Sequence, residues 1–541
     1  MNAVCLVFLV RQKSVLGSGR FEQLLNLLES GGGMTAQMYL SKSVLEAINP
    51  AIRQRLKALL EAKKLELLGA AMFEPWLPLI PKLDAAFQLK QYSAVLEQMF
   101  EVVTRGVWLL DCAWESQIAS LLISAGFEFT FLSAAQLERG AGLWITEDGG
   151  KTLRLFGFDS ALPNTASDFK PEPRDQLETK VLELQDTNES ICAIETVVAR
   201  FNNFKLCSQI IDTQKPQALI YPKASWNRPE PWRELLLNPQ INWLHKRIAR
   251  ASAKLNAQFR VPEEAYQFLY RAQQASILEQ PRLHSEAYQN IIKSENILEP
   301  HKYSWLEIEL LDFDCDGSDE VIAEAHTMNL YFKPSLGGKL LEFDDRNRSL
   351  NLISQALSDH FIGAEESMQR FALGQTLELG DFLNMPYDAS KYRDRVTMTR
   401  AGTVRGPSGV PVGVEVKKAI RMFPKESRLE VEYRLTNHGD WDIVTRFGSA
   451  WELELVSQDF ALISGQKEIL SQELNLEHRT TQSLGVRQNT AKIELRLNFG
   501  RENLVWSFQK RDSILILPLW DLDLPKGRSR RIHYEIKLLE V

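Results

Sequence analysis

The spacing of hydrophobic residues changes twice along this 541-residue chain, and this change restricts the fold more than any other feature. Up to about residue 225, short apolar runs alternate with helical patterns. From 226 to about 300, apolar residues recur every three or four positions. From 301 onward, apolar and polar residues alternate one by one. We therefore predict an α/β domain at 1–225, a helical segment at 226–300 and an antiparallel β-sandwich at 301–541.

Apolar runs in the first segment have the β-branched and aromatic content of buried strands. The runs lie at 4–10, 35–40, 65–72, 107–110, 127–132, 153–158, 191–194 and 218–221. Helical patterns lie between many of them, for example at 50–64 and 83–103. Repeated strand and helix indicate a parallel α/β architecture, which is either a barrel or an open sheet.

The later segments have simpler patterns. Helices are predicted at 241–255, 265–278 and 285–298. Alternating strands are predicted at 306–310, 414–420, 429–435, 492–497 and 531–538. Alternation with turn residues between the strands indicates a sandwich with one face of each sheet buried.

Composition excludes several classes of protein. The formal net charge is -7 and no long Lys/Arg cluster occurs, which argues against nucleic-acid binding. The five cysteines form no CxxC pair, which favours a reducing compartment over a disulfide scaffold. No stretch has the ~18 apolar residues of a membrane helix, and residues 1–10 lack the features of a signal peptide. We expect a cytoplasmic protein without a cofactor.

Several blocks in the last segment resemble those of a known family. Residues 311–321 contain D-x-D-x-D-G, and residues 331–342 contain K-P-x-x-G-G-x-L-x-E. The stretches 359–361 and 378–384 follow in the same order. Together they are similar to the C-terminal domain of the 4-α-glucanotransferases and α-amylases of glycoside hydrolase family 57.

The first segment carries further blocks similar to that family. Residues 73–75 with 80–82 resemble its (F/Y)-E-P…I-P-K block, residues 106–109 resemble the strand that carries its nucleophile, and residues 146–150 and 244–247 match other blocks. The resemblance covers nearly the whole chain. It implies a distorted (β/α) barrel, a helical segment packed on it, and a galactose-mutarotase-like sandwich. It also implies retaining attack on α-1,4-glucan, which needs two carboxyl groups about 5 Å apart.

The expected catalytic residues are altered. The family's first strand ends in H-x-H-Q-P, but no histidine occurs here before His245. Asp111 stands where the resemblance implies a glutamate nucleophile, and it is one methylene shorter. The place of the acid/base aspartate aligns with Val197, which transfers no proton. Glu195 is the nearby carboxyl that could replace it if it faces the site.

These departures leave three hypotheses for function. The first is a catalytically impaired protein that binds α-glucan or maltooligosaccharide, or pairs with an active relative. The second is an active retaining glycosidase or glucanotransferase that uses Asp111. The third is a non-catalytic interaction protein. The candidate substrate-binding residues are Glu74, which matches a family residue near the sugar, and the aromatic residues Trp76, Trp114 and Trp226, which follow predicted strands.

Residues 312–317 imitate the start of a calcium-binding loop. Asp312, Asp314 and Asp316 have the required spacing and Gly317 follows, but the twelfth position is Ala323 instead of glutamate. We therefore interpret the stretch as a strand that enters an Asp-Gly turn, and expect no metal site there.

Overall fold

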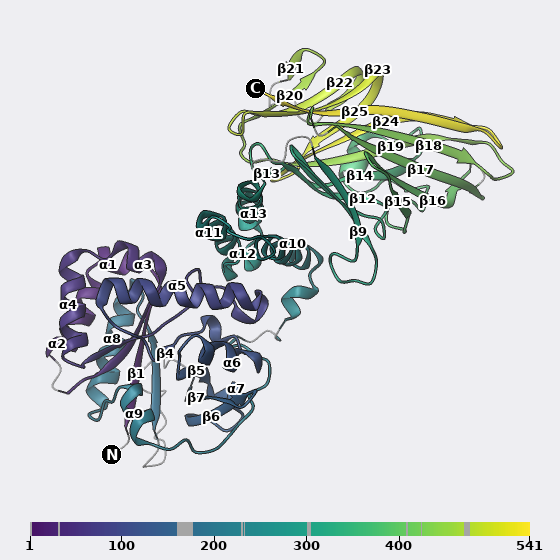
Figure 1. Ribbon diagram of the computed structural model, residues 1–541. Helices are drawn as coiled ribbons and strands as arrows, with labels where there is room; N and C mark the ends of the chain where they lie inside the picture. The colour runs from purple at the N-terminus through teal and green to yellow at the C-terminus, as the bar shows by residue number, and fades with distance from the viewer. Residues whose placement is uncertain are drawn as a thin grey trace. The chain divides into compact units, whose positions relative to one another are not determined.

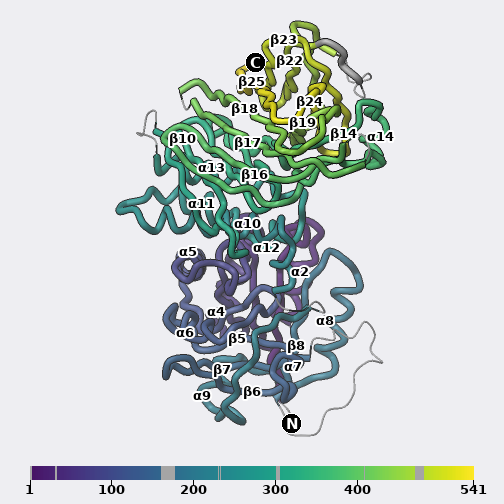
Figure 2. The backbone as a smooth tube through the Cα atoms, turned by 90° about the vertical axis from the view of Figure 1, so that its right-hand side faces the viewer, coloured from purple at the N-terminus to yellow at the C-terminus, as the bar shows by residue number. Residues whose placement is uncertain are grey.

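A computed structural model divides the chain into two compact units, whose backbone is shown in Figure 1 and Figure 2. Unit 1 contains residues 1–259 and 269–284, and unit 2 contains residues 260–268 and 285–541. The structure describes residues 3–30, 33–159, 177–228, 231, 233–299, 305–406, 409–423, 425–469 and 476–541. The predicted division at residues 225 and 300 stays a prediction.

Parallel pairing organises the first sheet of unit 1. The strand β1 (Val4–Val10) lies between β2 (Ala36–Leu40) and β8 (Glu178–Glu183), and β3 (Leu65–Leu67) pairs with β2 at the edge. Every residue of β1 and β2 is buried, as in a sheet covered on both faces. The apolar runs at 4–10 and 35–40 are therefore confirmed as buried strands.

A second sheet continues the first. The strands β4 (Gly106–Val107), β5 (Phe129–Ser133) and β7 (Lys151–Phe158) run parallel, and β6 (Gly142–Asp148) pairs with β7 in the antiparallel direction. An isolated parallel bridge between Gly69 and Val107 joins the two sheets. The α/β domain predicted from the sequence is confirmed, with an antiparallel strand and an interrupted junction as its distortions.

Two glycines allow the sheets to meet at this junction. The Gly69 N–H donates to the Gly106 carbonyl, and the Trp108 N–H donates to the Gly69 carbonyl, both at 2.8 Å. A Cβ added at Gly69 would lie less than 3.0 Å from the ring of Phe127, and one added at Gly106 would lie as close to Phe129. Because neither glycine has a side chain, the Phe127 and Phe129 rings can pack directly on the backbone there. This packing helps to position β4 and the residues that follow it.

Helices connect the strands of unit 1. In α4 (Pro50–Glu61), the Asn49 side chain accepts a hydrogen bond from the Ile52 N–H at 2.9 Å, which caps the helix. Its residues Ile52, Leu56 and Leu59 are buried at helical spacing. The other helices before residue 225 are α1 (Ser14–Gly17), α2 (Arg20–Ser30), α3 (Lys42–Ala47), α5 (Lys82–Phe100), α6 (Gln117–Ser124), α7 (Ala134–Leu137), α8 (Asn188–Arg200) and α9 (Cys207–Thr213).

The prediction of a strand at 191–194 is wrong, because these residues lie in α8. The Thr187 side chain caps that helix by accepting from the Ser190 N–H at 3.3 Å. Ile191, Ile194 and Val197 are its buried residues, at a spacing of three. A short buried helix face and a short buried strand are both apolar, so the run alone did not separate them. The strand that actually precedes this helix is β8.

Helices predominate between residues 239 and 298. They are α10 (Pro239–Asn256), α11 (Glu263–Ala272), α12 (Ala275–Glu279) and α13 (His284–Leu298). The predicted helical character of this region is confirmed, although the stretch 265–278 is broken after Ala272. None of the helices in the described ranges is long and apolar enough to cross a membrane.

Unit 2 is built mainly from antiparallel strands, which confirms the predicted sandwich. They are β9 (Leu306–Leu311), β10 (Glu320–Ala325), β11 (Met328–Lys333), β12 (Lys339–Asp345), β13 (Leu350–Asn351), β14 (Ile353–Ile362), β15 (Asp388–Lys391), β16 (Arg395–Arg405), β17 (Pro411–Phe423), β18 (Arg428–Asn437), β19 (Ile443–Glu454), β20 (Phe460–Ser464), β21 (Lys467–Ile469), β22 (Leu476–Gln488), β23 (Ile493–Gln509), β24 (Ser513–Leu524) and β25 (Ser529–Glu540). The core lies between two layers of strands.

The long strand β23 connects the layers. Its residues 493–498 pair with β25 in one layer, and its residues 504–509 pair with β24 in the other. Hydrogen bonding therefore runs continuously through both layers and returns to β9.

A buried charge pair explains two of the sequence blocks in unit 2. The Lys418 ammonium group donates to the Gly337 carbonyl at 2.8 Å and to Asp359 Oδ2 at 3.0 Å. The hydroxyls of Tyr387 and Tyr433 donate to the same carboxylate, each at 2.7 Å. Gly337 belongs to the G-G pattern and Asp359 to the 359–361 block, so both blocks support the interior of the sandwich.

The D-x-D-x-D-G stretch connects β9 to β10. The backbone N–H groups of Asp316 and Gly317 donate to the Asp312 carboxylate at 3.0 and 3.2 Å. The Lys333 ammonium group bonds to Asp314 and also contacts Asp316 at 2.7 Å. Carboxylate oxygens of Asp312, Asp314 and Glu320 lie within 4.8 Å of one another. A lysine of this chain therefore supplies positive charge to the turn.

The junction glycine gives a first prediction. We expect Gly106→Ala to lower the free energy of unfolding by about 1–3 kcal/mol, because the added methyl group would overlap the buried Phe129 ring. Gly17→Ala is the matched control, since nothing lies within 4 Å of a Cβ at that position. Urea unfolding of both variants measures the difference. Equal stabilities would show that the junction accepts a side chain.

The lysine in the acidic turn gives a second prediction. Lys333→Met leaves the buried carboxyl of Glu320, whose side chain is 0% exposed, without its cation. We expect a loss of about 3 kcal/mol in the unfolding free energy. Lys526→Met, which breaks an ion pair whose side chains are 61% and 84% exposed, should change stability little. Unfolding of both variants in guanidinium chloride measures the two losses. Similar losses of unfolding free energy would contradict the prediction.

Candidate functional site

The register of the parallel strands brings polar side chains to the end of β1. Leu9 pairs with Tyr39 on β2 and with Glu183 on β8. Arg11 follows the last residue of β1 directly. Because the carboxyl ends of parallel strands meet at one edge of a sheet, Arg11, Tyr39 and Glu183 lie in the same region.

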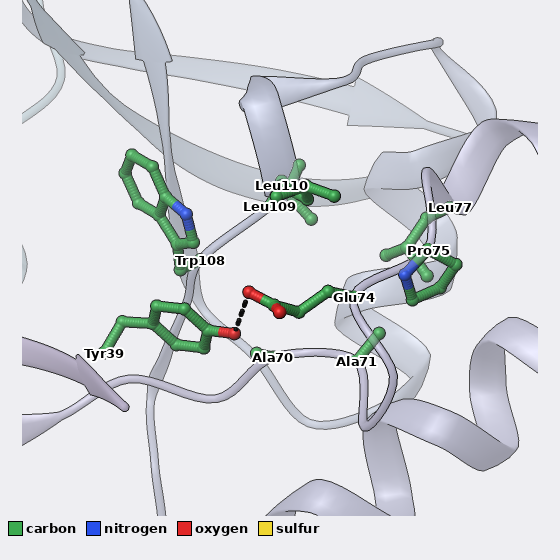
Figure 3. A pocket seen from close by; sticks show the side chains of 9 residues that line it. All are labelled: Tyr39, Ala70, Ala71, Glu74, Pro75, Leu77, Trp108, Leu109 and Leu110. Carbon is green, nitrogen blue, oxygen red and sulfur yellow. Dashed lines mark hydrogen bonds between the residues drawn. The ribbon is translucent and has the colours of Figure 1, made fainter. Parts of the chain in front are cut away.

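Glu74 lies in a small open pocket at this edge (Figure 3). The Tyr39 hydroxyl donates to Glu74 Oε1 at 2.8 Å, and the Arg11 Nε lies 3.6 Å from the same oxygen. The walls of the pocket are formed by Tyr39, Ala70, Ala71, Glu74, Pro75, Leu77, Trp108, Leu109 and Leu110. The Glu74 carboxylate and the Tyr39 hydroxyl are therefore the polar groups of a lining that is otherwise mostly apolar.

A chain of buried amides holds the Glu74 turn in place. The Phe73 N–H donates to Gln88 Oε1 at 3.1 Å, and Gln88 Nε2 donates to Gln273 Oε1 at 2.8 Å. Gln273 donates in turn to Asp84, which is fully buried. Glu74 itself has a φ of 49°. The turn is therefore fixed from α5 and from the end of α11.

Asp111 follows β4, in the short 3₁₀ helix Leu110–Cys112. Its Oδ2 accepts a hydrogen bond from Trp76 Nε1 at 2.9 Å and from Arg228 Nη2 at 2.6 Å. Its φ is 49°, and its side chain is 16% exposed. The Asn227 N–H donates to the Asp111 carbonyl at 2.7 Å, so the segment that carries Arg228 is anchored beside it.

Two tryptophans and an arginine pack together next to Asp111. The ring centroids of Trp76 and Trp226 are 5.1 Å apart with an interplanar angle of 65°. The Arg228 Cζ lies 5.1 Å from each of these centroids. Arg228 also bonds to Glu279, and its side chain is 27% exposed. The guanidinium group therefore contacts both aromatic rings while it pairs with two carboxylates.

The sequence-predicted residues separate into two groups. Asp111, Trp76 and Trp226 are joined to one another directly or through Arg228, and Glu74 contacts Tyr39 and Arg11. Trp114 is fully buried in the core of unit 1, where its backbone forms a bridge with Ser225. Its backbone therefore supports the position of the segment that leads to Trp226 and Arg228.

Glu183 is the site residue that the sequence reasoning missed. Burial raises its pKa, Arg11 lowers it, and the carboxylates of Glu74 and Asp111 add to the increase. Burial lowers the pKa of Arg11, and the carboxylates of Glu74 and Glu183 more than reverse that effect. Three carboxyl groups and two arginines therefore share one site. The sequence gives little signal for this strand, because residues 178–183 contain only two apolar residues, Val181 and Leu182, which are adjacent.

The positions expected to hold the acid/base residue lie elsewhere. Val197 is buried on α8, and Glu195 is exposed on the same helix. The expectation that these residues follow a late strand is wrong, because the run at 191–194 is helical. Glu183, at the end of β8, is the carboxyl that follows a strand in this part of the chain.

The first histidine of the chain has a structural contact near the site. His245, on α10, bonds through Nε2 to the Leu79 carbonyl at 2.7 Å. Burial lowers its pKa, and the hydrogen bond to Leu79 raises it less. Leu79 ends the short 3₁₀ helix Leu77–Leu79 that follows Trp76. His245 therefore helps to fix the segment that carries Trp76.

Comparison with known proteins identifies relatives of both units. Residues 20–142 match the model of glycosyl hydrolase family 57, and residues 312–355 and 353–511 match that of the C-terminal domain of alpha-amylase/4-alpha-glucanotransferase. An alpha-amylase of Pyrococcus horikoshii is 24% identical over 84% of this chain and 86% of its own length. A 4-alpha-glucanotransferase of Thermococcus kodakarensis is 22% identical over 71% of this chain and 77% of its own.

A solved structure supports the fold over the full length. The crystal structure of 4-alpha-glucanotransferase from Thermococcus litoralis superposes with a TM-score of 0.80 at 18% identity, and the match covers 100% of both chains. The combination of an α/β domain and a large antiparallel domain is therefore shared with that protein.

The raised pKa of Glu183 gives a third prediction. The folded protein binds this proton more tightly than the unfolded chain, so the contribution to stability is complete below the ordinary pKa of ~4.3 and is lost as pH rises through the raised value. Glu183→Gln cannot ionise, so it should become more stable relative to the unmodified protein as pH rises. Melting temperatures from about pH 4 to about pH 8 measure this difference. Glu195→Gln, on the exposed face of α8, is the control and should show no such trend. A flat difference for Glu183→Gln would contradict the prediction.

Proposed function

We propose that this chain, which is similar to glycosyl hydrolase family 57 in both units, binds α-1,4-glucan at the strand ends of unit 1 with impaired catalysis. The relatives named above are an α-amylase and a 4-α-glucanotransferase, which supports α-glucan as the ligand class. Aromatic rings, carboxylates and arginines at the same edge are the groups that bind sugar rings and their hydroxyls.

The observation that carries the proposal of impaired catalysis is the environment of Asp111. A carboxylate nucleophile attacks the anomeric carbon with its negative charge, and a cation paired with that charge makes it a weaker nucleophile. Here Oδ2 accepts from both Trp76 and Arg228, and the cation neutralises the charge. The side chain is also one methylene shorter than the glutamate that the resemblance implies, and a displacement of ~1 Å can lower a rate on the order of 100-fold.

Glu183 supports a second candidate, which is an active retaining glycosidase or glucanotransferase. A general acid needs a carboxyl that keeps its proton near neutral pH, and burial and like charges raise the pKa of Glu183 in that direction. In this candidate Asp111 attacks the anomeric carbon, and Glu183 protonates the leaving oxygen. The division of roles between two carboxyl groups in different environments is typical of retaining enzymes.

The proposal extends to location and partners. The five cysteines are free thiols, which supports a cytoplasmic location. Besides maltooligosaccharides, an active relative of the same family is a partner consistent with a glucan-binding protein that has lost turnover.

Incubation with maltoheptaose tests the proposal and gives a fourth prediction. We expect the sugar to raise the melting temperature, because a ligand at 100 times its Kd adds about 2.7 kcal/mol to the stability of the native state. Chromatography should show no new oligosaccharides at high protein concentration. Arg233→Ala, which breaks a contact with Glu115 at 2.6 Å but touches none of the site carboxylates described above, is a suitable control.

Two other outcomes would change the conclusion. New products that disappear in Asp111→Ala would establish the second candidate. Glu183→Gln should then lower the rate strongly, because glutamine donates no proton to the leaving oxygen. The absence of both products and a melting shift would leave an interaction protein that does not bind this glucan.

A further inference from the structure

We propose that Arg228 occupies the place of a sugar ring at the site, so that glucan must displace its guanidinium group in order to bind. This inference rests on the proposed function and names how that same site is regulated. Arg228 acts as an internal competitor that keeps the site closed until a longer or more tightly held ligand removes it.

The contacts of Arg228 are those that a glucan residue would need. A sugar ring binds by packing its C–H face on an aromatic ring and by donating hydroxyl protons to carboxylates. Arg228 packs on both Trp76 and Trp226, with its Cζ 5.1 Å from each ring centroid. It also donates to Asp111 at 2.6 Å and bonds to Glu279. The Arg228 side chain therefore occupies both the aromatic faces and the carboxylates with which a sugar ring would interact.

The charge of Arg228 adds to this competition. In a retaining reaction, positive charge develops on the sugar next to the nucleophile. The guanidinium group already places a permanent positive charge beside Asp111. Burial lowers the pKa of Arg228, but Glu279 and Asp111 raise it overall, so the group stays cationic. While the ion pair with Arg228 is intact, the negative charge of Asp111 is already neutralised and stabilises a positive charge on the sugar less.

The structure also allows the side chain to leave. Its backbone segment is held, since the Asn227 N–H donates to the Asp111 carbonyl and Ser225 pairs with Trp114. The side chain itself is 27% exposed, and the carboxylate of Glu279 is 31% exposed. The side chain of Arg228 can therefore rotate into solvent while its backbone stays in place. Water then solvates the guanidinium group that leaves the carboxylates.

Calorimetric titration with maltoheptaose tests the proposal. We expect Arg228→Ala to bind the sugar on the order of tenfold more tightly than the unmodified protein, because no internal group has to be displaced. Glu279→Gln weakens one of the two ion pairs and leaves Asp111 in place, so it should bind more tightly by a smaller factor. It also serves as the second variant if Arg228→Ala unfolds, which circular dichroism checks. Arg233→Ala should match the unmodified protein.

The outcomes separate this inference from the proposed function. Tighter binding by Arg228→Ala, or binding by this variant alone, supports the competitor. Equal or weaker binding by a folded Arg228→Ala, when the unmodified protein binds, overturns the inference and leaves glucan binding intact, with Arg228 as a ligand-contacting residue. Loss of binding in every protein overturns both, because maltoheptaose is then not a ligand of the site.

Discussion

Carboxylates collected at the ends of parallel strands must be neutralised, and this electrostatic requirement shapes the site of unit 1. Glu74, Asp111 and Glu183 come from different strand ends, and burial raises the pKa of Glu183. No histidine is available before residue 245, so arginines meet the requirement. Arg11 lies beside Glu74 and Glu183, and Arg228 pairs with Asp111. The ion pairs that stabilise these carboxylates also reduce the negative charge that each carboxylate presents to a ligand.

The fold could be predicted from the sequence wherever a pattern had one physical interpretation. The all-apolar run at 4–10 is long enough to be a buried strand, and single alternation in the last segment suits a sheet with one buried face. The run at 191–194 had two interpretations, because four apolar residues fit a helix face or a strand. The structure shows a helix there, capped by Thr187. The strand β8 was overlooked because residues 178–183 are mostly polar and their two apolar residues are adjacent.

The site could be predicted only in part, for a different reason. Glu74, Trp76, Asp111 and Trp226 each follow a predicted strand, and strand ends meet, so their assembly follows from topology. Arg228 and Glu183 could not be found in this way. The first lies in a segment whose place depends on the bridge between Trp114 and Ser225, and the second depends on the register of β8 with β1. Both are long-range pairings that sequence spacing does not encode.

The residues that hold the fold and the residues of the candidate site are independent in this chain, because each set depends on different interactions. The blocks in unit 2 hold a buried lysine–aspartate pair, and the junction glycines in unit 1 hold two phenylalanine rings against the backbone. Neither depends on which carboxylate attacks a sugar. A glucan can bind at an ion pair if it displaces the cation, whereas nucleophilic attack uses the negative charge that the cation neutralises. In the proposed function, the pair between Arg228 and Asp111 Oδ2 therefore lowers turnover more than it lowers recognition.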